Sequence, residues 1–124
     1  MRALHQISVG LGAALLALAA SQAFAAGDPD RGETVYQGCQ DCHTLDKNDV
    51  GPRHRGVFGR KAGSLPDFDY SDALKGADFV WNEETLDKWL TDPQAFRPGA
   101  RMFYHLSEPK DRADVIAFLR ERAR

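Results

Sequence analysis

Two cysteines and a histidine lie together near the start of the chain, in the order Cys39-Gln40-Asp41-Cys42-His43. Within a helical turn this spacing lets both sulfurs reach the two vinyl groups on one edge of a porphyrin. The histidine that follows can then bind the porphyrin iron through its imidazole. The motif therefore predicts covalent attachment of one haem through Cys39 and Cys42, with His43 as the proximal iron ligand.

The same residues permit three other interpretations. A thioredoxin-like redox motif would stand near a βαβ pattern, which this sequence does not show. A structural zinc site needs four ligands, and no second Cys/His pair stands at ligand spacing. A structural disulfide is the third alternative, because the chain has only these two cysteines, but a bridge over so short a loop removes little chain entropy. Haem attachment is the interpretation that we favour.

The second axial ligand of the iron follows by elimination. The chain has two methionines, and Met1 would leave with a secretory signal, so Met102 remains. His54 and His105 are the competing histidines. We expect His54 on the proximal side, because it follows His43 closely, whereas His105 stands three residues from Met102. Met102 lies in a Pro-Gly loop that packing alone does not require, so we favour it and keep His105 as the alternative.

The first 25 residues are typical of a secretory signal peptide. Arg2 gives a short positive start, residues 7–20 are largely apolar, and Ala23-Phe24-Ala25 supplies the small residues that a signal peptidase needs. We therefore expect residues 1–25 to be a signal and residues 26–124 to be one domain, located in the periplasm. A retained membrane anchor is the alternative, although the apolar run is short for a membrane span.

The charge balance excludes one class of partner. The chain has 124 residues with 16 Lys+Arg and 18 Asp+Glu, a net charge of −2. Loss of Arg2 with the signal would leave 15 basic and 18 acidic residues, a net charge of −3. Nucleic acid is not an expected partner, because its binding needs a basic face that neutralises phosphates.

The size of the predicted domain, residues 26–124, is close to the limit of what a single hydrophobic core stabilises. A buried cofactor would therefore add to its stability.

The first half of the domain predicts one helix followed by long loops. Asp28-Pro29 is typical of a helix start, and a short helix should run from there into the cysteine motif. Residues 44–80 are rich in Gly, Pro, Asp and Ser and predict loops, with one short helix near residues 71–75. So long an irregular stretch needs something to wrap around in a compact domain.

The second half predicts two more helices. Asn82 can cap the first of them, and Asp92-Pro93 ends it. Its buried stripe has the spacing i, i+3 and i+4 and consists of Leu86, Trp89 and Leu90. Residues 94–106 then predict a loop, and Ser107 can cap a last helix with Pro109 in its first turn. The apolar face of that helix contains Ala113, Val115, Ile116, Ala117, Phe118 and Leu119.

Six stretches, in order over nearly the whole domain, resemble the class I c-type cytochromes, close to the group of mitochondrial cytochrome c and bacterial cytochrome c2. They are Cys39–His43, Gly51-Pro52, Gly56-Val57-Phe58-Gly59-Arg60, Tyr70-Ser71-Asp72-Ala73, Trp81–Leu86 and Pro98-Gly99-Ala100-Arg101-Met102. The resemblance implies a small all-α fold in which crossed N- and C-terminal helices and loops enclose one haem c. It implies that Gly32, Tyr36 and Phe118 lie at the crossing, and that the Pro52 carbonyl accepts a hydrogen bond from the His43 ring.

The resemblance also implies a set of propionate contacts. Arg60, Tyr70 and Trp81 would hydrogen-bond a buried haem propionate, because a buried carboxylate must be paired. From the residues alone, they are equally well a surface cation and two core aromatics. Three positions depart from the family pattern: His54 stands where an apolar residue is common, Trp89 replaces a frequent tyrosine, and Ala100 replaces a common threonine.

A six-coordinate iron has no open site for a substrate, which favours outer-sphere electron transfer over catalysis. We therefore expect a soluble periplasmic one-electron carrier, not an enzyme, whose haem iron alternates between Fe2+ and Fe3+. We expect it to work as a monomer between redox proteins, either membrane complexes or periplasmic enzymes. The alternatives are a peroxidase, the haem subunit of a dehydrogenase, and a sensor that exchanges its ligand. A peroxidase would need distal acid/base groups, which the sequence does not reveal.

Overall fold

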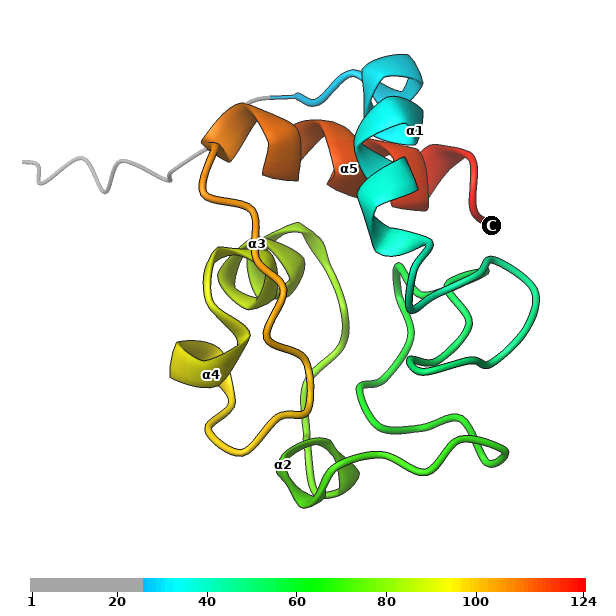
Figure 1. Ribbon diagram of the computed structural model, residues 1–124, viewed down its shortest axis with the longest axis vertical. Coiled ribbons are helices and arrows are strands. Elements are labelled where there is room, and N and C mark those ends of the chain that lie inside the picture. Colours follow the sequence, from blue (N-terminus) through cyan, green and yellow to red (C-terminus); the bar gives the residue numbers. More distant parts are fainter. Residues whose placement is uncertain (1–25) are drawn as a thin grey trace, which may run out of the picture.

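The computed structural model describes residues 26–124, which form five α-helices and one 3-10 helix (Figure 1). The helices are α1 (Pro29–Tyr36), η1 (Gln37–Cys39), α2 (Asp72–Lys75), α3 (Glu83–Thr91), α4 (Pro93–Phe96) and α5 (Pro109–Glu121). These residues contain no β-strand, only an isolated antiparallel bridge between Lys61 and Val80. The all-α prediction is confirmed. The predicted signal peptide falls on residues 1–25, outside the described part, and no helix within residues 26–124 is long and apolar enough to cross a membrane.

Helices α1 and α5 cross at close range at one end of the molecule (Figure 1). Helix α1 is capped at its N-terminus by Asp28, whose carboxylate accepts two amides of the first turn. Gly32 lies at the contact, where an added Cβ would stand 1.9 Å from the carbonyl oxygen of Asp114, so a larger residue would push the helices apart. The rings of Tyr36 and Phe118 pack together with their centroids 5.0 Å apart. The crossing that the resemblance implies is therefore present.

Asp114 is a buried carboxylate that links the two crossing helices. It is 1% exposed and accepts hydrogen bonds from the Asp28 amide at 2.8 Å and the Lys110 ammonium at 2.9 Å, and it pairs with Arg31. Burial by itself would raise the pKa of Asp114, but the amide and the two cations outweigh burial and lower it to about 2. The carboxylate therefore remains charged at neutral pH.

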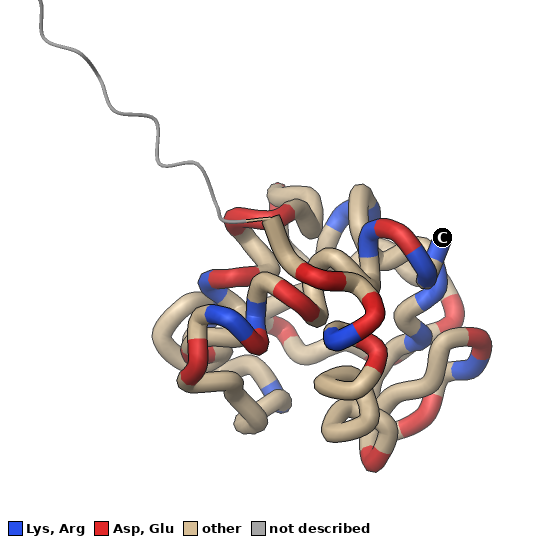
Figure 2. The backbone as a smooth tube through the Cα atoms, turned by 90° about the horizontal axis from the view of Figure 1, so that it is seen from above, with Lys and Arg blue, Asp and Glu red and all other residues tan. Residues whose placement is uncertain are grey.

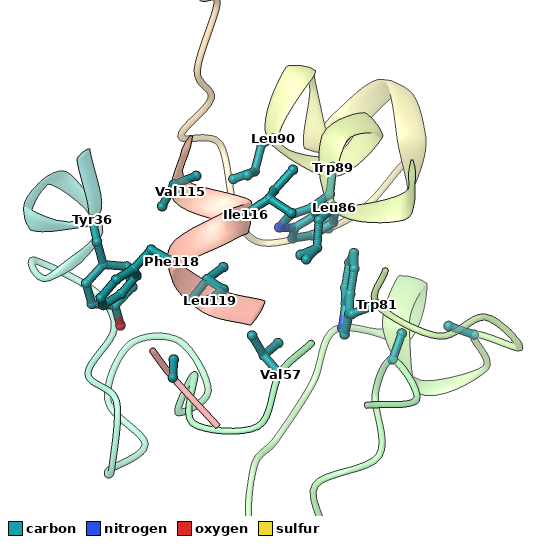
Figure 3. Packing of buried hydrophobic residues seen from close by; sticks show 14 residues of the cluster. Tyr36, Val57, Trp81, Leu86, Trp89, Leu90, Val115, Ile116, Phe118 and Leu119 are labelled. Atoms are coloured by element: carbon teal, nitrogen blue, oxygen red, sulfur yellow. The ribbon is translucent and has the colours of Figure 1, made fainter. Parts of the chain in front are cut away.

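Helix α3 starts with the predicted cap. The Asn82 side chain accepts the Thr85 amide at 2.9 Å, and the Thr85 hydroxyl accepts the Asn82 amide at 2.8 Å, which is a reciprocal capping box. The predicted stripe of α3 is buried and packs toward α5 in the core (Figure 3). The largest side chains of this cluster are Tyr36, Val57, Trp81, Leu86, Trp89, Leu90, Val115, Ile116, Phe118 and Leu119.

The segment after α3 differs from the prediction. The sequence predicts a loop from residue 94, but α4 begins at Pro93. The Asp92 carboxylate accepts the amides of Gln94 at 3.0 Å and Ala95 at 3.1 Å, so this residue starts a new helix at the point where α3 ends. The Asp-Pro pair at residues 92–93 thus has the same capping role as Asp28-Pro29.

The cap of α5 also differs from the prediction. Glu108, rather than Ser107, is the N-cap residue of α5, and its side chain makes no capping hydrogen bond. The chain is held at this point by Arg112, whose guanidinium donates to the carbonyls of Leu106 at 2.9 Å and Ser107 at 3.0 Å. A long side chain from within the helix therefore replaces the short cap that the sequence suggests.

Figure 1 shows how the elements surround the middle of the molecule. The loops that follow η1 lie on one side, and α3, α4 and the segment 97–108 lie on the other. Helices α1 and α5 cover one end, and α2 lies at the opposite end. His43 and Met102 thus belong to segments on two different sides.

Candidate haem-binding site

The cysteine motif forms the helical turn that the sequence predicts, directly after η1. The amides of Cys42 and His43 both donate to the Cys39 carbonyl, at 3.2 and 2.9 Å. Both cysteines are free thiols, so the alternative of a structural disulfide is not realised. Burial, with a smaller effect of Cys42, raises the pKa of the Cys39 thiol to about 11. A turn with both sulfurs free is the geometry that thioether bonds to one porphyrin edge require.

The His43 ring is fixed by the segment that follows it. Its Nδ1 donates to the Pro52 carbonyl at 2.8 Å, as the resemblance implies. An added Cβ at Gly51 would stand 2.1 Å from Cε1 of the ring, so only glycine allows this approach. Burial lowers the pKa of His43, although Pro52 and Asp49 act in the opposite direction. The ring is therefore neutral, and Nε2 carries the lone pair that a metal ion needs.

Met102 lies on the loop after α4 and is half-buried against the hydrophobic core. Gln94 of α4 holds this loop, because its Nε2 donates to the carbonyls of Ala100 at 2.7 Å and Met102 at 3.0 Å. The Arg97 guanidinium donates to a carbonyl oxygen of α2 at 3.0 and 2.6 Å. Sequence analysis missed Gln94 because it placed this residue in a loop. The Asp-Pro pair just before it was the signal that could have revealed the helix.

The residues after Met102 are exposed. Phe103 is 73% and Tyr104 is 46% exposed, and His105, the competing ligand, is exposed as well. Tyr104 lies against the segment before the first cysteine, since a Cβ added at Gly38 would be 2.8 Å from its hydroxyl oxygen. The loop that carries Met102 therefore reaches across to the cysteine turn.

The residues that we expect to contact a haem propionate lie in one region of the structure. The Trp81 amide donates to the Arg60 carbonyl at 2.9 Å, and the Gly59 amide donates to the Trp81 carbonyl at 2.7 Å. The Arg60 guanidinium donates to two backbone carbonyls of the preceding loop, at 2.9 and 2.6 Å. Burial lowers the pKa of Arg60, whereas the nearby Tyr70 raises it. Tyr70 and Trp81 are both buried. Burial is also what the alternative interpretation, two aromatic side chains of the core, predicts for them.

Ser71 is a residue that sequence analysis missed. Among the buried side-chain polar atoms of residues 26–124, its hydroxyl oxygen has no hydrogen-bond partner. It does not cap α2 through its side chain, although it occupies the N-cap position. An unsatisfied buried hydroxyl costs about 1–3 kcal/mol. A ligand with a polar group beside Tyr70 would supply the missing partner.

Half-buried apolar side chains from several helices and loops pack against the core. They are Val35, Cys39, Leu45, Phe58, Leu74, Phe79, Phe96, Met102 and Leu106. A flat apolar group against such side chains would gain about 25 cal/mol for each Å² of apolar surface removed from water. The donor set at His43, the two thiols, the orphaned hydroxyl and this apolar surface therefore fit a haem.

The fold and the cysteine turn together define a class, the small all-α domains that bind haem covalently. The family model for cytochrome c matches residues 29–123, and the chain belongs to the cytochrome c family. It accordingly carries one covalently attached haem c with its iron, and it transfers electrons rather than catalysing a reaction.

Individual relatives agree with this assignment. The chain is 50% identical over 117 residues to cytochrome c2 of Rhodomicrobium vannielii, which covers 91% of this chain and 93% of that protein. It is 41% identical over 103 residues to cytochrome c of Cochliobolus lunatus, covering 79% and 95% of the two chains. The solved structure of cytochrome cH from Methylobacterium extorquens is similar with a TM-score of 0.73 at 42% identity, over 76% of this chain and 98% of that one. The resemblance inferred from the motifs is confirmed.

Proposed function

We propose that this protein is an exported mono-haem electron carrier of the periplasm. Cys39 and Cys42 would hold the haem through thioether bonds, and His43 and Met102 would bind its iron. The haem supplies an iron that alternates between the ferrous and ferric states. The observation that carries the proposal is the helical turn at Cys39–His43, which presents two free thiols and a histidine with its Nε2 available.

The protein's own residues keep the two axial ligands in place. The hydrogen bond from His43 to Pro52 selects one tautomer and strengthens the ring as an electron donor to a metal. On the other side, Gln94 donates to backbone carbonyls of the loop that carries Met102, and Arg97 ties this loop to a backbone carbonyl of α2. These contacts hold the Met102 thioether close to one position. A site whose ligands stay in place in both redox states suits electron transfer. With protein residues at both ligand positions, the iron has no open position for a substrate.

A second group of residues accommodates the charge of a propionate. Arg60, Tyr70 and Trp81 offer N–H and O–H donors in a largely buried region, and Ser71 adds a hydroxyl with no other partner. A buried carboxylate without such donors would be strongly destabilising. We assign these side chains to one haem propionate.

The compartment and the partners complete the proposal. The signal-like pattern of residues 1–25 supports export, and thioether bonds at both cysteines suit an oxidising compartment. We propose that the protein is a monomer that exchanges electrons with membrane complexes or periplasmic enzymes. The exposed Phe103 and Tyr104 beside Met102 give such partners a route of approach. Acidic and basic residues are interspersed over the backbone (Figure 2), so charge would orient a partner only locally.

Haem extraction tests the proposal. We expect acid–acetone treatment to leave the haem on the polypeptide, as a pyridine haemochrome spectrum would show, and a Cys39→Ser/Cys42→Ser double variant to release it. Extractable haem in the wild type would contradict covalent attachment. Mass spectrometry of the periplasmic fraction should give a mature chain that begins at Ala26 or Gly27. An uncleaved chain in the membrane fraction would contradict export.

A further inference from the structure

His54 lies against the face of the His43 ring. The two imidazole centroids are 3.9 Å apart and the ring planes differ by 18°, which is a stacked arrangement. The amide of His54 donates to the Thr44 carbonyl at 3.0 Å, so its loop is fixed alongside the segment directly after His43. The residue is thus on the proximal side, as the sequence predicts, but in contact with the ligand itself.

His54 is in turn held by Tyr36. The Tyr36 hydroxyl lies 3.0 Å from Nδ1 of His54, within hydrogen-bonding distance, and the two ring centroids are 5.6 Å apart. Tyr36 is 2% exposed and packs on Phe118 where α1 crosses α5 (Figure 3). A continuous series of contacts therefore runs from the helix crossing through Tyr36 and His54 to His43.

The stacking of His54 on His43 restrains a tilt of the His43 ring that the hydrogen bond to Pro52 does not prevent. The Nδ1 bond to Pro52 fixes one atom and the tautomer, but a ring can still tilt about the line of a single hydrogen bond. A flat neighbour at 3.9 Å blocks this tilt on one face, and the Gly51 backbone lies against the ring edge. The plane of the His43 ring is therefore set by its neighbours as a group.

We propose that His54 is a positioning residue for the axial histidine, oriented by Tyr36, and that its polar ring favours the oxidised state of the centre. The inference rests on the proposed role of His43 as an iron ligand. Ferric haem carries one positive charge more than ferrous haem, and polar groups near the ligands stabilise this charge. An apolar side chain at position 54 therefore raises the reduction potential.

Three variants of the holoprotein separate orientation from polarity. His54→Leu removes both the flat ring and its polar atoms, His54→Phe keeps a flat ring, and Tyr36→Phe removes the hydroxyl while keeping the packing on α5. The readouts are the hyperfine-shifted haem methyl signals in the NMR spectrum of the ferric protein, which report the plane of the axial ligands, and the reduction potential. His105→Leu, a change of the same kind at an exposed histidine, is the control.

We expect His54→Leu to change the methyl pattern and raise the potential. His54→Phe should keep most of the wild-type pattern but raise the potential, Tyr36→Phe should give a smaller change of pattern, and the control should change neither. Wild-type methyl patterns in both His54→Leu and Tyr36→Phe would overturn the positioning role, and an unchanged or lower potential in His54→Phe would overturn the polar effect. Failure of the proposed function would be visible separately, as a wild-type spectrum without a histidine-ligated low-spin haem.

Discussion

Replacing Asp114 by Asn should destabilise the crossing of α1 and α5. Burial opposes the charge of Asp114, but the Asp28 amide, Lys110 and Arg31 together lower its pKa to about 2. An unfolded aspartate has a pKa of about 3.9, and a difference of about two units corresponds to roughly 2–3 kcal/mol of stability at neutral pH. The Lys110 and Arg31 side chains are 68% and 43% exposed, which weakens their pairs by solvent screening. We therefore expect a loss of about 1–2 kcal/mol in the free energy of unfolding.

The loss should depend on pH in one direction. Because folding lowers this pKa, the stabilisation is complete above pH about 4 and disappears as the pH falls toward about 2. Guanidinium unfolding of both proteins at neutral pH and near pH 2.5, followed by circular dichroism, measures the difference between them. Asp111→Asn is the matched control, since this carboxylate pairs with the same Arg31 but is 28% exposed. Equal losses in the two variants, or a loss for Asp114→Asn that is the same at both pH values, would refute the reasoning.

The other predictions concern the loop that carries Met102. Gln94→Ala removes two hydrogen bonds to this loop, worth roughly 1 kcal/mol or more together, so cyanide should bind the ferric protein about fivefold to tenfold faster than the wild type. Stopped-flow rates measure this, with the exposed Gln37→Ala as control, and equal rates would show that other contacts hold the loop. Arg101 is 63% exposed, with its guanidinium 3.6 Å from the Asp69 carboxylate. Electron transfer with an acidic-faced partner should slow as salt rises, and Arg101→Glu should slow it further at low salt. A rate that rises with ionic strength would contradict this, because it would show that the acidic residues of this chain dominate the encounter and would point to a basic-faced natural partner.

The parts of the fold that were predictable depend on local chemistry. Asp28-Pro29 and Asn82 mark helix starts because their side chains bond amides only two or three residues away, and such signals are contained in a short stretch of sequence. The same chemistry at Asp92-Pro93 carries two signals at once, because this pair ends α3 and also caps the helix that follows. The start of α5 could not be found in this way, because Arg112 makes its contacts from one turn inside the helix.

The candidate site likewise contains residues whose role is visible in a short stretch of sequence and residues whose role depends on distant segments. Cys39–His43 was predictable because all of its chemistry lies in five consecutive residues. Gln94 and Ser71 were not, since their roles depend on backbone that reaches them from other segments, and no periodicity in the sequence records such contacts. The stack of His54 on His43 is an intermediate case: the sequence indicated the side of the molecule, but only the structure shows the contact between the two rings.

The optical spectrum of ferric Met102→Ala tests the central claim most directly. The claim is that Met102 closes the sixth position of a haem that is bound at Cys39–His43. The wild type should have the weak long-wavelength charge-transfer band of methionine-ligated ferric haem, and Met102→Ala should lose this band, lower the reduction potential and open the iron to cyanide. His105→Ala, the matched change at the competing residue, should keep the band. A band that persists in Met102→Ala and disappears in His105→Ala would contradict the account.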